Sequence, residues 1–218
     1  DEFQQISDFE DSKTFQKKLR SVWQLQQHVS YCLFGSKKHL MNELFEKKNL
    51  PFYKFGDAIY LAKIETKYWI EYICKRFENT GKHISPELAE EICRLVDNHS
   101  SYVQQLSWLL WIRTINTATT EQLSYALEDL LDQNNILFQS ETENLSAYQM
   151  NFLKAIVDGI HTKFSSKEVI SKYNLGTSAN IVRLKNALLQ KELIETNGKE
   201  IVLADPVFGV WFKKEMLY

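Results

Sequence analysis

The dipeptide Asn197-Gly198, placed between two short apolar runs, is the feature that most restricts the fold of this chain. The flanking runs are Leu193 to Thr196 and Glu200 to Leu203. Asparagine followed by glycine favours the positive φ angles of a two-residue hairpin turn. The sequence therefore predicts an antiparallel β-hairpin near the end of the chain.

Three helical patterns precede this hairpin. The first begins near Leu145, the second at the capping sequence Ser165 to Glu168, and the third at Thr177 or Ser178. In each pattern apolar residues recur three or four positions apart, as in a helix with one buried face. Three short helices followed by a hairpin predict a winged helix-turn-helix domain in residues 145–218.

A domain of this kind binds either DNA or another protein surface. For DNA, polar side chains on the outer face of the third helix enter the major groove, and the candidates are Thr177, Ser178, Asn180, Arg183 and Lys185, with Lys199 on the wing. Residues 145–218 carry ten Lys or Arg and seven Asp or Glu. This excess is mild for a nucleic-acid-binding protein, so docking on a protein partner or self-association remains the alternative.

The first part of the chain alternates strand and helix patterns. Val29 to Phe34 and Ala58 to Ile64 are short apolar runs of the kind that form buried strands. Helical spacing predicts amphipathic helices over residues 12–27 and 37–47. Two strands are too few for a stable open sheet. We therefore expect strands from elsewhere to complete an α/β layer.

The middle of the chain shows only helical patterns. Residues 65–133 predict a helical bundle, whose last helix begins at the capping box Thr119 to Gln122. Residues 134–144 are rich in polar side chains and predict a linker. The expected fold class is mainly α with some β: two strands of an α/β core, a helical bundle and a C-terminal winged helix-turn-helix.

Five short motifs occur in an order that resembles the archaeal-type ATPase family, a STAND-like branch of the AAA+ P-loop ATPases. They are Asp1-Glu2-Phe3-Gln4, Phe34-Gly35-Ser36-Lys37-Lys38-His39-Leu40-Met41, Pro51-Phe52-Tyr53, Tyr102-Val103-Gln104 and Asp205-Pro206-Val207-Phe208. The resemblance implies that residues 1–64 are the C-terminal part of a P-loop ATPase core. It also implies that residues 65–133 are the helical lid and that the winged helix follows it.

The same resemblance assigns roles in ATP hydrolysis. It implies that Asp1 holds Mg²⁺ through water, that Glu2 activates the attacking water, and that Ser36 senses the γ-phosphate. A phosphate-binding loop needs two glycines five residues apart, and none of the seven glycines has that spacing. We therefore expect a missing N-terminal nucleotide-binding segment, and no tight binding of ATP or Mg²⁺ by this chain alone.

The lid departs from the family pattern. Asn98-His99-Ser100-Ser101 stands where the family has Gly-His-Pro, so no nucleotide contact is carried onto this turn, and His99 is expected to start a helix. Arg20 and Arg113 are candidates for an arginine finger or a lid sensor. Each lies on an amphipathic helix, where a surface ion pair is the alternative.

A third interpretation is an adaptor with aromatic anchors at Trp108, Trp111, Trp211 and Phe212, although aromatic residues at helical spacing are more often core. No apolar run approaches the roughly 20 residues of a membrane span, and no secretory signal is seen, so a cytoplasmic location is expected. Three cysteines without a Cys-x-x-Cys pair predict buried, reduced thiols.

Overall fold

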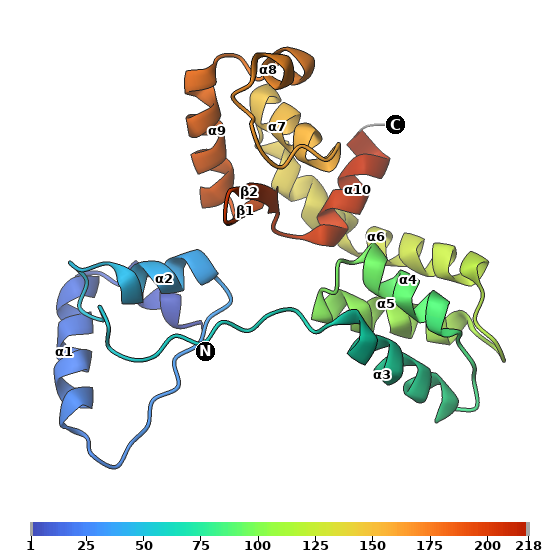
Figure 1. Ribbon diagram of the computed structural model, residues 1–218, viewed down its shortest axis with the longest axis horizontal. Coiled ribbons are helices and arrows are strands. Elements are labelled where there is room, and N and C mark those ends of the chain that lie inside the picture. Colours follow the sequence, from blue (N-terminus) through green and yellow to red (C-terminus); the bar gives the residue numbers. More distant parts are fainter. Residues whose placement is uncertain (1, 217–218) are drawn as a thin grey trace. The chain divides into compact units, whose positions relative to one another are not determined.

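The computed structural model describes residues 2–216, except for the side chains of Lys38 and His39. The chain divides into two compact units, Asp1–Leu61 and Ala62–Tyr218. Figure 1 shows the elements of each unit. The two units are described separately below.

The first unit is built from short helices around a small aromatic core. Its elements are the 3₁₀ helix η1 (Phe3–Asp8) and the α-helices α1 (Ser12–Leu25) and α2 (Lys38–Glu46). Phe52 is fully buried at the centre, with its ring 5.4 Å from that of Phe3 and 5.7 Å from that of Trp23. Ile6 and Leu44 complete the buried set.

The two strands expected in this unit are not formed. Val29 to Phe34 and Ala58 to Ile64 lie outside every strand that the structure describes. Their apolar side chains face solvent, since Phe34 is 55% exposed and Leu61 is 94% exposed. A strand requires a hydrogen-bonded neighbour, and within residues 2–216 neither segment has a strand beside it. These segments therefore keep the apolar composition of buried strands without their burial.

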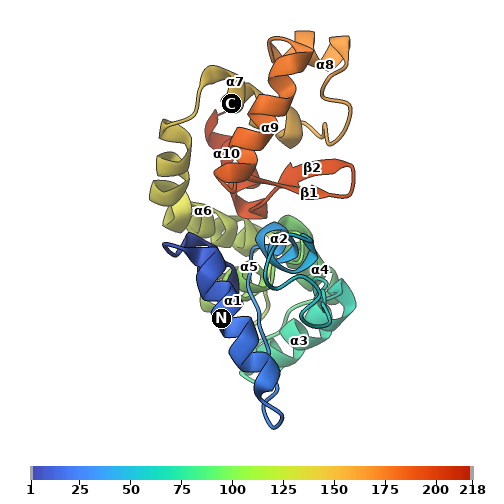
Figure 2. The same ribbon diagram turned by 90° about the vertical axis from the view of Figure 1, so that its left-hand side faces the viewer.

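The second unit begins with the helical bundle that the sequence predicts. Its helices are α3 (Thr66–Glu78), α4 (Pro86–Leu95), α5 (Ser100–Arg113) and α6 (Thr120–Glu143). Thr119 and Gln122 form the predicted capping box, with reciprocal hydrogen bonds of 3.3 and 3.1 Å. Figures 1 and 2 show α3, α4 and α5 side by side, with α6 extending beyond them.

The prediction of a linker over residues 134–144 is wrong, because α6 continues through these residues to Glu143. Phe138 and Thr142 in this stretch are buried. The Phe138 ring lies 5.4 Å from that of Phe208 and 5.6 Å from that of Trp211. Packing against these aromatic rings therefore compensates for the weak helical pattern of the polar residues.

The C-terminal winged helix is confirmed. It comprises α7 (Ala147–Val157), α8 (Lys167–Tyr173), α9 (Ser178–Gln190), β1 (Ile194–Asn197), β2 (Glu200–Leu203) and α10 (Pro206–Met216). The strands are antiparallel, with Asn197 opposite Glu200, and Gly198 has the positive φ of 62° that the turn requires. The mainly helical fold class with a small β content is thus the one that the sequence predicts.

The expected cap of α8 is displaced by one residue. The N-cap is Ser166, whose side chain accepts a hydrogen bond of 3.3 Å from Val169 N. The buried-thiol expectation also fails at one position, because Cys32 is exposed. Cys93 is buried, and that burial raises its pKa to about 11.

Candidate functional site

The residues predicted to act on ATP come together in the first unit. The backbone N–H of Phe3 donates to the carbonyl oxygen of Phe34 over 3.0 Å, which places the start of the chain beside the extended segment 29–34. The Ser36 hydroxyl then donates to Glu2 Oε2 over 3.1 Å. The structure therefore joins Glu2 and Ser36, which are 34 residues apart in the sequence. The Asp1 prediction lies outside the described residues.

Gln4 joins this pair, a contact that the sequence analysis did not predict. Its amide nitrogen also donates to Glu2 Oε2. The hydrogen bonds from Ser36 and then Gln4 hold the pKa of the Glu2 carboxyl below its ordinary value. The only sequence signal for this contact is that residues 2 and 4 occupy alternate positions in one short motif.

A groove of about 580 Å³ lies beside this cluster within the first unit. Both extended segments contribute to it, and its lining includes Tyr31, Phe34, Phe45, Phe55, Ile59 and Leu61. The lining is mainly apolar, and the two segments that border the groove belong to no strand among the described residues. A β-strand is the kind of element that such a groove accepts, because its side chains would cover the apolar lining.

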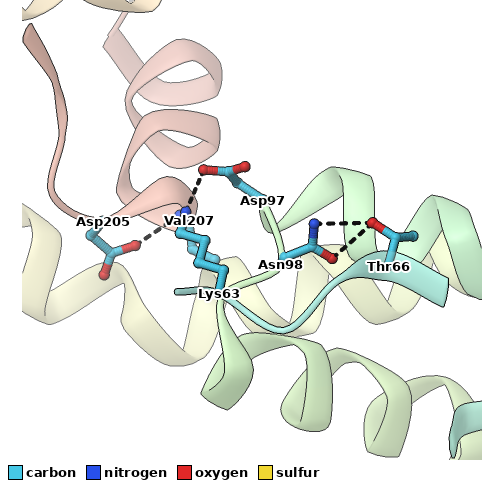
Figure 3. Close-up of polar contacts among 6 residues, drawn as sticks. All are labelled: Lys63, Thr66, Asp97, Asn98, Asp205 and Val207. Carbon is cyan, nitrogen blue, oxygen red and sulfur yellow. Dashed lines mark hydrogen bonds and ion pairs between the residues drawn. The ribbon is translucent and has the colours of Figure 1, made fainter. Parts of the chain in front are cut away.

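The turn before α5 in the second unit has a left-handed backbone without glycine. Asp97 has a φ of 47° and Asn98 a φ of 54°. Figure 3 shows Lys63 paired with Asp97, at 2.6 Å, and Asn98 facing Thr66, with which it forms hydrogen bonds of 3.1 and 3.2 Å. Asparagine tolerates this region better than most residues, and its side-chain bonds offset the strain.

His99 lies at the N-cap position of α5, so the prediction that it starts a helix is confirmed. Its side chain makes no capping hydrogen bond, and its ring lies 4.8 Å from that of Tyr102. Its Nδ1 atom is buried and has no hydrogen-bond partner among the residues that the structure describes. His99 therefore serves as a packing residue in this turn.

Two of the family-like motifs meet at one hydrogen bond. The Tyr102 hydroxyl, on α5, donates to Asp205 Oδ2 over 2.5 Å. The other carboxylate oxygen of Asp205 accepts a hydrogen bond from the backbone N–H of Val207 (Figure 3). The same oxygen accepts from the backbone N–H of Phe208, and so Asp205 caps α10. Burial, followed by the Asp205 interaction, raises the pKa of Tyr102. This bond ties the helical bundle to the winged helix across 103 positions.

We expect Tyr102→Phe to lower the free energy of unfolding of the second unit by about 1.5 kcal/mol, because the substitution removes a hydrogen bond to a charged, part-buried group. Urea unfolding followed by circular dichroism measures the change. The exposed Tyr125→Phe is the matched control, with an expected change below about 0.5 kcal/mol. Equal effects for the two variants would show that the Asp205 contact adds nothing.

The two arginines considered as finger or sensor are both engaged within their own units. Arg20 donates to the carbonyl oxygens of Pro51 and Tyr53, the second at 3.1 Å. Arg113 pairs with Asp129 through two nitrogens, at 2.5 and 2.8 Å. Arg113 thus forms the surface ion pair that was the alternative to a finger or sensor role.

The residues proposed to contact DNA differ in their exposure to solvent. Thr177, Ser178 and Arg183 are exposed at or along α9, whereas Lys185 is half-buried. Asn180 donates to the Leu175 carbonyl oxygen over 3.1 Å and so supports the preceding loop. Lys199 is exposed in the hairpin loop, where Glu200 follows it.

The aromatic residues considered as partner anchors differ in their exposure to solvent. Trp211 and Phe212 are each 1% exposed and belong to the core. Trp111 is half-buried and donates through its ring nitrogen to Thr80 over 2.8 Å. Trp108 is 57% exposed on α5. Only Trp108 of these four therefore presents a large apolar surface to solvent.

Comparison with known proteins shows which class of domain the C-terminal part of the chain forms. A family described as a probable winged helix domain matches residues 136–214. Among solved structures, the chain is similar to a Walker-type ATPase of Pyrococcus abyssi, with a TM-score of 0.74 and 17% sequence identity. The similarity covers 97% of this chain and 61% of that one. At this identity the likeness establishes the fold, and the chain spans less than two thirds of the ATPase. No curated protein matches the chain.

The described residues contain neither a candidate membrane span nor a candidate metal site. No helix in residues 2–216 has both the length and the apolar character of a membrane span. No group of three or more His, Cys, Asp or Glu side chains in the described part is arranged to hold a metal ion.

Proposed function

We propose that this chain is the C-terminal portion of an ATP-hydrolysing protein, whose nucleotide-binding segment lies outside these residues. The main support for the proposal is the hydrogen bond between Ser36 and Glu2, since it joins the two residues to which the family resemblance assigns the γ-phosphate and the attacking water. The fold shared with a Walker-type ATPase supports the same function.

Each residue has a defined chemical role in this proposal. The Glu2 carboxylate orients the attacking water and accepts its proton. The Ser36 hydroxyl has one proton, which it donates to Glu2 in this structure and would donate to the γ-phosphate when ATP is bound. Asp1 would hold Mg²⁺ through water, and the carboxylate and hydroxyl oxygens gathered here are donors of the kind that this ion prefers. When bound, the ion neutralises charge on the phosphates.

The exposed apolar side chains of segments 29–34 and 58–64 support a binding partner in the same protein. Both line the groove of about 580 Å³, and both expose apolar side chains that a sheet would bury. A strand from the nucleotide-binding segment, placed in this groove, would hydrogen-bond to the extended backbone on its two sides. The segment proposed here thus completes both the sheet and the ATP site.

We further propose that the winged helix acts in regulatory docking. It shares one apolar core with the helical bundle, through Phe138, Phe208 and Trp211, and the Tyr102–Asp205 bond reinforces this junction. A change in the lid is therefore transmitted to the winged helix through packed side chains. The acidic residue beside Lys199 on the wing favours docking on protein over binding to DNA phosphates.

The ATPase proposal is tested with Glu2→Gln in the full-length protein. We expect the ATP turnover number to fall by about 10²- to 10⁴-fold, the usual contribution of a general base. The exposed Glu10→Gln, in the same unit, removes one negative charge elsewhere and should keep full turnover. A wild-type protein that does not hydrolyse ATP, or a Glu2→Gln variant as active as wild type, would overturn the proposal.

The choice between protein docking and DNA binding is tested by titrating duplex DNA between about 50 and 200 mM salt. Docking predicts weak association with little dependence on salt, and no change in Arg183→Ala. A steep salt dependence that this substitution reduces would instead assign the winged helix to DNA.

A further inference from the structure

Gln4 is a buried polar residue of the first unit, and its burial lowers the stability of the fold. It is 2% exposed, and its carbonyl oxygen Oε1 has no hydrogen-bond partner among the described residues. An unsatisfied buried carbonyl destabilises the fold, and an apolar side chain at this position would avoid that cost. The compensating contact is the amide nitrogen, which donates to Glu2 Oε2.

The observed position of the Gln4 side chain requires a glycine at position 35. A Cβ atom on Gly35 would lie 1.9 Å from Gln4 Oε1 and 3.0 Å from Gln4 Cδ. The φ angle of Gly35 is outside the left-handed region, so its backbone conformation is open to other residues. The missing side chain is therefore needed for space, and the space is occupied by Gln4.

Two donors from separate segments reach the same carboxylate oxygen. Ser36 approaches from the end of the extended segment 29–34, and Gln4 approaches from η1. Two hydrogen bonds from different directions fix the orientation of a carboxylate better than either does alone. Gly35 lies between these segments and permits both contacts.

We propose that Gln4 is a positioning residue, which holds the Glu2 carboxylate beside Ser36 in the orientation needed to activate water, and that Gly35 is required to admit it. The inference rests on the proposed role of Glu2 in ATP hydrolysis. Gln4 acts only through Glu2, and so it affects the turnover of bound ATP and leaves ATP binding unchanged.

The test is Gln4→Met in the full-length protein, since methionine fills the same space but cannot donate a hydrogen bond. We expect kcat to fall by about 10²-fold while KM for ATP stays unchanged. Gln16→Met is the matched control, because Gln16 is also 2% exposed but donates to Ser12. That control should keep the wild-type kcat.

Gly35→Ala is a second way to remove the hydrogen bond from Gln4 to Glu2, because the added methyl group displaces the Gln4 side chain. It should lower both kcat and stability, and Gly35→Ala combined with Gln4→Ala should restore stability without restoring kcat. In a Glu2→Gln background, Gln4→Met should cause no further loss.

The outcomes separate the two proposals. If wild type hydrolyses ATP and Glu2→Gln abolishes this, a Gln4→Met variant with unchanged kcat overturns the positioning role and leaves the ATPase proposal intact. A raised KM, or an equal loss of kcat in Gln16→Met, indicates a structural role and also overturns it. Wild-type protein without ATPase activity overturns both.

Discussion

Trp211→Ala is expected to lower the free energy of unfolding of the second unit by about 3–5 kcal/mol, the cost of emptying a large aromatic site in a core. Trp211 is 1% exposed, its ring lies 5.6 Å from that of Phe138, and its ring nitrogen donates to Asn135 over 2.8 Å. Both partners belong to the part of α6 that the sequence predicts as a linker.

Hydrogen exchange of peptides from α6 and α10 measures this effect within the unit. Trp108→Ala is the matched control, since the same residue type is 57% exposed there, and its expected cost is below about 0.5 kcal/mol. Exchange that accelerates in α10 but not in residues 134–143 would mean that this part of α6 is stable without the winged helix, contrary to the packing described here.

Phe52→Ala is expected to unfold or strongly destabilise the first unit, by about 3–5 kcal/mol. Phe52 is fully buried, and its ring is within 6 Å of those of Phe3, Trp23, Phe45 and Phe55. So few other apolar residues are buried in this unit that the loss of one large side chain removes much of its core. Hydrogen exchange of peptides from residues 2–61 provides the measurement.

Phe34→Ala is the matched control for Phe52→Ala and also tests the groove. In the 218-residue chain Phe34 is 55% exposed, so the expected cost is below about 0.5 kcal/mol. In the full-length protein the proposed strand would cover Phe34, and the cost should then rise above about 1 kcal/mol. The same small cost in both proteins would argue against a strand at this position.

The junction between the lid and the winged helix gives the proposed regulation a physical basis. α6 belongs to the helical bundle at its start and to the aromatic cluster with α10 at its end. Buried contacts therefore hold both ends of α6. In the proposed function, displacement of residues 65–133 as a lid would shift the winged helix through this helix.

The candidate site was partly predictable. The family resemblance implied that Glu2 and Ser36 belong to one site, and the structure shows a hydrogen bond between them, while their roles stay a prediction. The roles of Gln4 and Gly35 were not predictable, because they depend on the space between two segments brought together by folding. The Tyr102–Asp205 contact was also not predictable, because each residue belongs to a separate local motif and nothing in the spacing connects them.

The sequence by itself determined those elements that are stabilised by residues close together in the chain. The Asn197-Gly198 turn, the capping box at Thr119 and the helical periodicity of the bundle depend on residues within a few positions, and these predictions are confirmed. Tertiary structure decided the rest. Residues 134–143 became helix because Phe208 and Trp211 pack on them, and Val29 to Phe34 formed no strand because a strand exists only beside another strand.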